Sequence, residues 1–175
     1  QYIKIMNHDD ASNEEKCSML QRVFGQLKTA GLSENTIVCA SNAQVELIES
    51  QLDGRAEVAV EPMRRDTFPA VMLSCAYLLS KKGASEEDVV AFLPVDPYTT
   101  IEFFNRIKKL GDYIKESDDT IGLLGGVPTY ASTKYGYIVP EQADKELLKV
   151  EGFREKPDEA TAEKLVADGA LWNCG

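Results

Sequence analysis

The sequence predicts an α/β domain in which a mainly parallel sheet is covered by helices on both faces. Three short apolar segments, residues 36–40, 57–60 and 88–95, are separated by segments whose apolar residues recur at helical spacing. Strands without a polar face are typical of a parallel sheet that has helices on both sides. Because 175 residues with 43% hydrophobic side chains can bury one sizeable core, we expect a single domain over residues 1–175.

The first elements are predicted by their capping signals. Residues 7–16 are polar enough for a surface loop. Ser18-Met-Leu-Gln21 has the form of a capping box, and the apolar residues that follow at helical spacing end near Gly31, which suits a helix C-terminus. After the first strand, Ser41-Asn-Ala-Gln44 has the same form, so we expect a second helix there.

The middle of the chain repeats the order of strand and helix. An apolar helix is expected over residues 68–79, with Thr67 as its N-cap and Pro69 in its first turn. After the third strand, Thr99-x-x-Glu102 predicts the start of a helix over residues 101–115. This alternation indicates a doubly wound α/β arrangement.

The second half of the chain has a different pattern. Residues 120–127, 135–139 and 149–153 have the composition of strands and are joined by loops, and residues 160–167 return to helical spacing. We therefore expect a mixed sheet laid against the first half.

The charge and the cysteines exclude several classes of protein. A formal net charge of -10 argues against nonspecific binding of nucleic acid or of an anionic membrane. No apolar run approaches the roughly 20 residues that a membrane span needs, and the first residues lack the architecture of a signal peptide. Four cysteines without a Cys-x-x-Cys pair favour free thiols over a disulfide framework or a zinc site, which indicates a reducing cytoplasm.

Two polar segments follow predicted strands, at the sheet edge where such folds bind ligands. In one, Asp96 leaves an apolar strand between Pro94 and Pro97, which suits a magnesium ligand or, equally, the cap of a turn. In the other, Arg64 and Arg65 precede a helix N-terminus and could hold a phosphate, although an exposed charged turn is the commoner arrangement.

Three further segments in the second half carry polar chemistry. Tyr135-Gly136-Tyr137 would let a sugar ring approach the backbone, or would form a strand with a bulge. Glu155-Lys156-Pro157 would turn a carboxylate and an ammonium towards a cleft because the proline stops the strand ladder; a surface ion pair is the alternative. Trp172-Asn173-Cys174-Gly175 suggests a shaped polar pocket, although a lone tryptophan is more often part of a core.

These motifs occur in one order along essentially the whole chain: Glu61-Pro-x-x-Arg-Asp-Thr67, Pro94-Val-Asp96, Tyr135-Gly-Tyr-Ile138, Phe153-x-Glu155-Lys156-Pro157 and Trp172-Asn-x-Gly175. Together they resemble the mannose-1-phosphate guanylyltransferases, or GDP-mannose pyrophosphorylases, of the sugar-nucleotidyltransferase family. The resemblance implies a Rossmann-like nucleotide-diphospho-sugar transferase fold. It also implies Mg²⁺-dependent attack of mannose 1-phosphate on the α-phosphorus of GTP, giving GDP-mannose and pyrophosphate.

The resemblance further implies a role for individual residues of these motifs. The expected roles are Asp96 as metal ligand, Glu155 on sugar hydroxyls, Lys156 on the sugar phosphate, Gly136 and Asn173 in the sugar pocket, and Glu61, Arg65 and Thr67 near the nucleotide. Asp96 and Lys156 would thus be the catalytic groups, since metal and ammonium offset the charge of two anions that must meet. The transfer needs no nucleophilic side chain, which fits the lack of a Ser-His or Cys-His constellation.

The chain departs from the family pattern in two ways. Pro97 follows Asp96 where the family commonly has a histidine. The family's glycine-rich triphosphate loop is expected upstream of Gln1 and its second metal-binding aspartate beyond Gly175, so we expect a fragment, incomplete at both ends, with little or no activity alone. Another hexose-1-phosphate nucleotidyltransferase and a non-catalytic nucleotide-sugar-binding regulatory module stay open as alternatives, as does assembly into a homo-oligomer.

Overall fold

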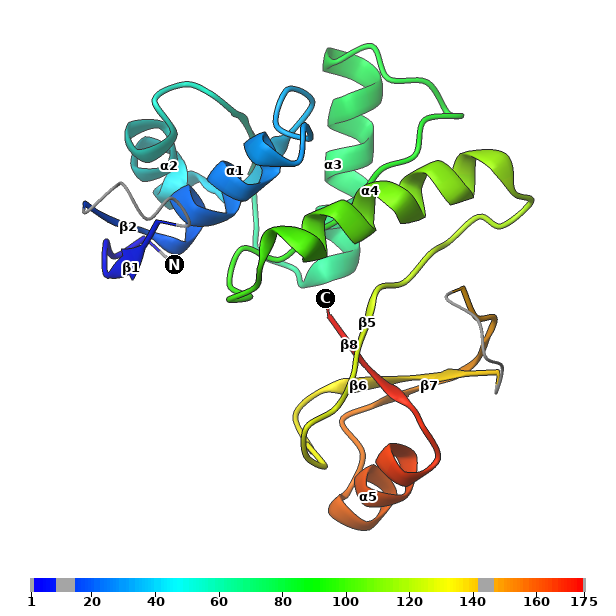
Figure 1. Cartoon of the computed structure of the whole chain (residues 1–175). Helices are drawn as coiled ribbons and strands as arrows, with labels where there is room; N and C mark the ends of the chain where they lie inside the picture. The colour runs from blue at the N-terminus through cyan, green and yellow to red at the C-terminus, as the bar shows by residue number, and fades with distance from the viewer. Residues whose placement is uncertain (1, 9–14, 142–146, 175) are drawn as a thin grey trace. The chain divides into compact units, whose positions relative to one another are not determined.

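The computed structural model describes residues 2–8, 15–141 and 147–174. The chain forms two compact units, residues 1–119 and 120–175, and each is described by itself below (Figure 1). The expectation of a single domain over the whole chain stays a prediction.

The first unit contains a parallel pair of strands and four α-helices among its described residues. Its elements are β1 (Met6–Asn7), β2 (Lys16–Cys17), α1 (Met19–Thr29), β3 (Ile37–Ser41), the 3-10 turn η1 (Asn42–Gln44), α2 (Val45–Leu52), β4 (Glu57–Glu61), α3 (Thr67–Lys81) and α4 (Ile101–Glu116). β3 and β4 run parallel, in a register that pairs Ile37 with Glu57 and Ser41 with Glu61. This is the parallel arrangement that the apolar strands predicted.

β1 and β2 form a short antiparallel pair at the two ends of the expected surface loop. The loop was expected over residues 7–16, so its first and last residues are strand residues instead. Residues 9–14, the remainder of that expectation, lie outside the described part of the chain.

The capping box of α1 is confirmed. Ser18 Oγ accepts a hydrogen bond from the Gln21 backbone N–H at 3.2 Å, and Gln21 Oε1 accepts one from the Ser18 N–H at 3.1 Å. At the other end, Gly31 has φ +73°, and the Leu32 N–H donates to the Leu27 carbonyl at 2.8 Å. A glycine in the left-handed region closes the last turn as predicted. The second box also forms, but it opens the turn η1 ahead of α2.

Two expected caps are displaced by one residue. Thr67 begins α3 and Asp66 occupies its N-cap position, without a capping hydrogen bond from its side chain. α4 is capped by Thr100 rather than Thr99, because the Thr99 carbonyl accepts a hydrogen bond from the Gln26 side chain, whereas the Thr100 carbonyl accepts from the Phe103 N–H. Tertiary contacts therefore decide which residue opens the helix.

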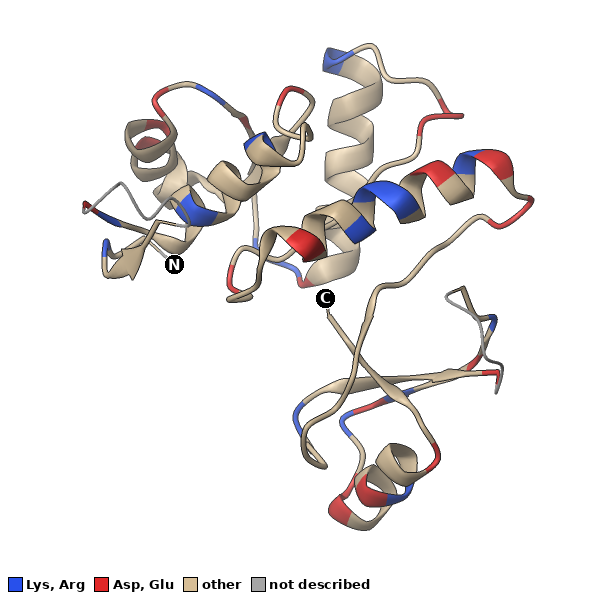
Figure 2. Cartoon of the chain, in the orientation of Figure 1, with Lys and Arg blue, Asp and Glu red and all other residues tan. Residues whose placement is uncertain are grey.

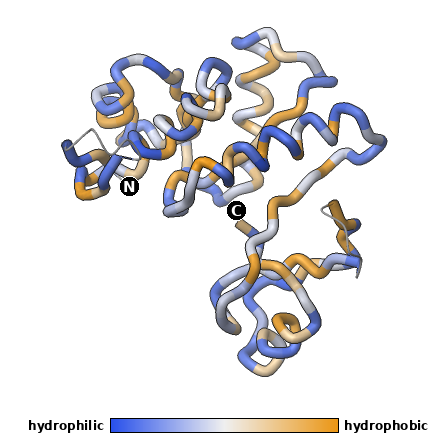
Figure 3. Tube along the Cα trace, in the orientation of Figure 1, coloured by the Kyte–Doolittle hydropathy of each residue, from blue (hydrophilic) through white to orange (hydrophobic). Residues whose placement is uncertain are grey.

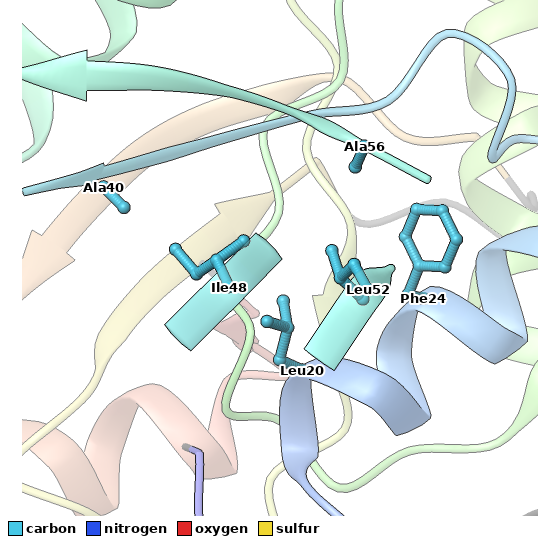
Figure 4. Close-up of a cluster of buried hydrophobic side chains, with 6 residues drawn as sticks. All are labelled: Leu20, Phe24, Ala40, Ile48, Leu52 and Ala56. Atoms are coloured by element: carbon cyan, nitrogen blue, oxygen red, sulfur yellow. The ribbon is translucent and has the colours of Figure 1, made fainter. Parts of the chain in front are cut away.

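The main core of the first unit lies between the sheet and two helices. Figure 4 shows the buried cluster that fills it: Leu20 and Phe24 from α1, Ile48 and Leu52 from α2, and Ala40 and Ala56 from the sheet side. Side chains alternate along a strand, so Cys39 faces the opposite side, where its Sγ lies 3.9 Å from the Ala70 carbonyl of α3. The pair of strands is thus covered on both faces, as expected for α/β architecture.

A second cluster joins α1 to α4. Figure 3 shows α4 as alternating apolar and polar turns, and its Phe104 is only 2% exposed against Val23, Leu27 and Ala30. Burial of one apolar face of an amphipathic helix is what positions α4 on α1.

The prediction of a third strand over residues 88–95 is wrong, because this segment is irregular and carries no strand ladder. Val89, Val90 and Phe92 are exposed, whereas Leu93 packs against the α4 cluster and Val95 against the main core. A strand exists only through hydrogen bonds to a neighbour, and no described segment pairs with this one. Composition alone therefore predicted neither the pairing of this segment nor the burial of its first five residues.

The second unit is a small antiparallel sheet with one helix. Its elements are β5 (Gly125–Gly126), β6 (Gly136–Pro140), β7 (Val150–Glu155), α5 (Glu159–Ala167) and β8 (Leu171–Asn173), with sheet order β5-β8-β6-β7. All three strand pairs are antiparallel, so the expectation of a mixed sheet here is wrong. Only two residues of the expected strand 120–127 pair, and β8 was not expected. Tyr137, Ala162 and Ala170 form the core beneath α5.

Two further observations bear on the sequence expectations. Among the described residues, no helix combines the length and the apolar character that a membrane crossing requires. All four cysteines are free thiols, as predicted, and Cys17 is fully buried.

Candidate functional site

The second unit aligns three of the expected sugar-site residues in one row across its sheet. Gly136 of β6 pairs directly with Glu155 of β7. On the other side of β6, Tyr137 pairs with Trp172 of β8, so the antiparallel register places Asn173 level with Gly136. Residues opposite each other on neighbouring strands point to the same face. Asn173, Gly136 and Glu155 therefore share one face of the sheet.

That face is the one away from α5. Tyr137 and Trp172 alternate with the row residues, and both belong to the apolar cluster that includes Ala162 and Leu165 of α5. On the face that carries the row, the next cross-strand row is apolar and consists of Leu171, Ile138 and Phe153, so the polar groups border an apolar strip.

Gly136 leaves room for its neighbours on β7. A Cβ atom at this position would lie 2.6 Å from Glu155 Oε2 and 2.6 Å from Phe153 Cζ. The β-bulge lies at Val139 and Pro140, so it does not explain the glycine. The side chain of Glu155 instead rests directly on the Gly136 backbone, a close approach that only glycine permits.

Lys156 ends the β7 ladder in an unusual backbone conformation. Its φ is +42°, a left-handed value that costs a non-glycine residue about 1–2 kcal/mol. Its N–H still donates to the Tyr135 carbonyl at 3.2 Å, and its Nζ lies 3.1 Å from Glu155 Oε1. Both side chains are more than half exposed, and such ion pairs stabilise a fold little. The left-handed backbone of Lys156 therefore costs more free energy than the ion pair with Glu155 contributes. Local strain of this kind is typical of functional sites.

Three aromatic rings meet beside the row. The rings of Tyr130 and Tyr135 each lie edge-on to Trp172, with centroids 5.0 and 5.1 Å away. A hydrogen bond with Tyr130 raises the pKa of Tyr135. Sequence reasoning singled out Tyr135 and Trp172 but missed Tyr130, because it lies in a loop where no periodicity marks it. Contacts from both tyrosines hold Trp172, and with it the adjacent Asn173.

The expected nucleotide residues lie in the segment between β4 and α3 of the first unit. Glu61 is the last, half-buried residue of β4, and Thr67 is the first residue of α3. Arg65 is exposed and donates to Met63 Sδ at 3.3 Å. Between them, Asp66 has φ +63° and ψ -168°, a region that non-glycine residues rarely adopt. The loop holds the three residues on one short stretch of backbone.

Asp96 is exposed in an irregular segment, and its carboxylate has no hydrogen bond or ion pair to any described residue. No group of three or more His, Cys, Asp or Glu side chains in the described ranges could form a protein cage for a metal. Mg²⁺ usually retains waters and is held by one or two carboxylates together with substrate phosphates. A single unengaged carboxylate fits that mode of binding, and it does not fit an all-protein cage.

The charged residues are spread over both units. Figure 2 colours Asp and Glu positions on α2, α4, β7 and α5, with Lys and Arg positions interspersed on α4, β7 and α5, whereas α3 carries no acidic residue. In a chain with a net charge of -10, an anionic ligand therefore depends on local cations such as Arg65 and Lys156.

Comparison with known proteins identifies the family. A sequence profile described as Nucleotidyl transferase matches residues 12–173, which is most of the chain and includes both units. The chain belongs to the nucleotidyl transferase family.

Curated relatives match most of the chain at moderate identity. The chain is 29% identical over 171 residues to the mannose-1-phosphate guanylyltransferase RfbM of Salmonella typhimurium, covering 94% of this chain and 35% of that protein. It is 28% identical over 167 residues to the alginate biosynthesis protein AlgA of Pseudomonas aeruginosa, covering 90% of this chain and 34% of AlgA. The chain therefore spans about a third of the length of these relatives.

Solved structures agree with this assignment. A Thermus thermophilus protein titled mannose-1-phosphate geranyltransferase superposes with a TM-score of 0.78 at 28% identity, over 90% of this chain and 46% of that one. A Helicobacter pylori protein titled mannose-6-phosphate isomerase gives a TM-score of 0.70 at 22% identity, over 90% of this chain and 59% of that one, and shows the fold alone. The nucleotidyltransferase-type α/β fold is thus confirmed.

Proposed function

We propose that the full-length protein transfers a guanylyl group from GTP to mannose 1-phosphate. A phosphate oxygen of the sugar phosphate attacks the α-phosphorus of GTP, the bond from that phosphorus to the bridging oxygen breaks, and pyrophosphate leaves with GDP-mannose as product. The observation that carries the proposal is the row of Asn173, Gly136 and Glu155 with Lys156 at its end. Relatives named mannose-1-phosphate guanylyltransferase support the choice of substrates.

The row supplies complementary chemistry for a sugar phosphate. The Glu155 carboxylate accepts hydrogen bonds from sugar hydroxyls, and the Asn173 amide both donates and accepts. The Lys156 ammonium, 3.1 Å from Glu155, meets the phosphate that the sugar carries. Close packing of Glu155 on Gly136 preorganises the carboxylate, so less conformational freedom is lost on binding.

The first unit supplies the groups for the nucleotide. Glu61, Arg65 and Thr67 lie on the segment that enters α3, where a guanidinium and backbone N–H groups favour an anion. Asp96 would hold Mg²⁺, which neutralises charge on the phosphates when it is bound. With charge offset and reactants oriented, no covalent enzyme intermediate is required.

The test is product formation by the full-length protein. Incubation with GTP, mannose 1-phosphate and Mg²⁺ should release pyrophosphate and GDP-mannose in equal amounts, measured by anion-exchange chromatography. Parallel reactions with UTP, dTTP or ATP and with glucose 1-phosphate determine the base and the sugar. Folded protein that binds GDP-mannose but turns over no pair of substrates would contradict the proposal and indicate a binding module instead.

A further inference from the structure

Two polar side chains on α1 are buried where apolar ones would be expected. Arg22 and Gln26 are 5% and 2% exposed, one helical turn apart and therefore on the same face. Their neighbours Val23 and Leu27 belong to the apolar cluster with α4. A buried guanidinium and a buried amide are costly unless their contacts compensate for the lost hydration, so what they contact indicates why they are present.

Both side chains hold the backbone that follows Asp96. The Arg22 guanidinium lies 4.3 Å from the centroid of the Tyr98 ring. Gln26 Nε2 donates to the Thr99 carbonyl at 2.8 Å, and Gln26 Oε1 accepts from Arg22 at 3.3 Å. The three contacts form one connected network that links α1 to residues 98 and 99.

The residue that precedes Asp96 packs against the core that α1 shares with α2 and the sheet. Val95 contacts the core cluster that contains Leu20 and Phe24 of α1. Pro97 restricts the backbone between Val95 and Tyr98 because its ring limits φ. Asp96 is thus held on both sides, although its own carboxylate contacts no described residue.

We propose that Arg22 and Gln26 are positioning residues that fix the segment 96–99 and thereby orient the Asp96 carboxylate toward a metal-bound phosphate. The role of Asp96 at a metal-bound phosphate rests on the proposed function. The anchoring of residues 96–99 by α1 does not depend on that function. Segment 96–99 has no strand ladder of its own, so these contacts from α1 replace the order that a ladder would supply.

The experiment compares four variants of the full-length protein. Gln26→Leu removes the amide but keeps similar volume, and Arg22→Met removes the guanidinium. Arg22→Lys keeps a cation that can still reach the Tyr98 ring. The matched control is Arg55→Met, because Arg55 also stacks on a ring, that of Phe24 at 5.5 Å, but has no contact with the segment.

The first measurement is hydrogen exchange of the peptide that contains residues 99–106, because the Phe103 N–H donates to the Thr100 carbonyl at 3.1 Å, directly after the anchored segment. Gln26→Leu and Arg22→Met should exchange about tenfold faster there, as expected when a local contact is lost, while peptides from β3 and β4 are unchanged. Arg22→Lys should lie between wild type and Arg22→Met, and Arg55→Met should match wild type in this peptide. Unchanged exchange in both Gln26→Leu and Arg22→Met would overturn the anchoring.

The second measurement is the rate of GDP-mannose formation. Gln26→Leu and Arg22→Met should lower kcat about 10- to 100-fold, because a small displacement of a group at the reacting phosphates slows the transfer strongly. Both variants should leave the KM for mannose 1-phosphate unchanged. Faster exchange with an unchanged kcat would overturn the role in orienting Asp96. A wild-type protein that makes no GDP-mannose would refute the proposed function, while the exchange measurement would still decide the anchoring.

Discussion

The carboxylate of Glu155 lies directly against the backbone of Gly136 on the neighbouring strand. The two residues are paired in the register of β6 and β7, and a Cβ on Gly136 would approach Glu155 Oε2 to 2.6 Å. The Glu155 carboxylate, which is expected to bind the sugar, can therefore take this position only because Gly136 opposite it has no side chain. This relationship makes the proposed site sensitive to a single methyl group.

Gly136→Ala should displace Glu155 and the ring of Phe153, and so reduce both activity and stability. We expect a loss of about 1–3 kcal/mol in the free energy of unfolding, the usual cost of overpacking, and at least a tenfold rise in the KM for mannose 1-phosphate. Urea unfolding and steady-state kinetics measure the two effects. Gly152→Ala on β7 is the control, because nothing lies within 4 Å of its added Cβ. Equal effects of the two substitutions would contradict the close-approach argument.

Lys156→Ala should lower kcat by roughly two to three orders of magnitude, the size expected for loss of one preorganised charge contact. Lys156→Gly should be as inactive but more stable than Lys156→Ala, because glycine accepts the left-handed backbone that Lys156 adopts at φ +42°. Lys164→Ala, which removes a charge from α5, is the control. If Lys156→Ala retained wild-type kcat, the ammonium would have no part in the transfer.

Tyr137→Phe should destabilise the second unit. The Tyr137 hydroxyl is fully buried, donates to the Ser132 carbonyl at 2.9 Å and accepts from the Ser132 N–H at 2.8 Å. Its removal leaves both backbone groups without this partner, at a cost of about 1–3 kcal/mol. Denaturant unfolding measures the change. Tyr113→Phe should not shift the unfolding midpoint, since that hydroxyl is exposed to solvent and donates to the exposed Asp119 at 2.9 Å.

Asp158 should make the stability of the protein depend on pH at acidic values. Its Oδ1 accepts from the Thr161 N–H at 2.8 Å at the start of α5, and this backbone hydrogen bond lowers the pKa of Asp158. The unfolded chain, with a pKa of about 3.9, therefore takes up the proton first as pH falls. The stabilisation is present above about pH 4 and is lost as pH falls through the folded-state pKa.

Asp158→Asn isolates this effect, because asparagine keeps the capping oxygen but does not titrate. Thermal unfolding followed from about pH 7 to pH 3 should show the wild-type curve falling more steeply than the variant curve below pH 4. Parallel curves over the whole range would show that the Asp158 cap does not depend on its charge.

Local signals in the sequence were sufficient for the helices. Ser18 with Gln21 and Gly31 predicted both ends of α1, because a cap is formed within a few residues of chain. The strand expected over residues 149–153 forms as β7, but it continues to Glu155, and Pro157, which cannot donate to a ladder, follows two residues later.

Nonlocal contacts explain the errors. Residues 88–95 have the composition of a strand, but no described segment pairs with them. β8 has only three residues, too few for a periodic signal, and its partners lie more than thirty positions earlier in the chain. The sequence gives no local signal for the role of Arg22 and Gln26, because their partners Tyr98 and Thr99 lie more than seventy residues later in the chain.

The sequence by itself determined the α/β class, the helices and the family motifs, because hydrophobic spacing, caps and motif residues are properties of short segments. Only the tertiary structure decided that Asn173, Gly136 and Glu155 share one row and one face, because strand register depends on pairing between distant segments. The same holds for the Thr99 carbonyl, which Gln26 captures from another helix and so shifts the start of α4 to the next residue.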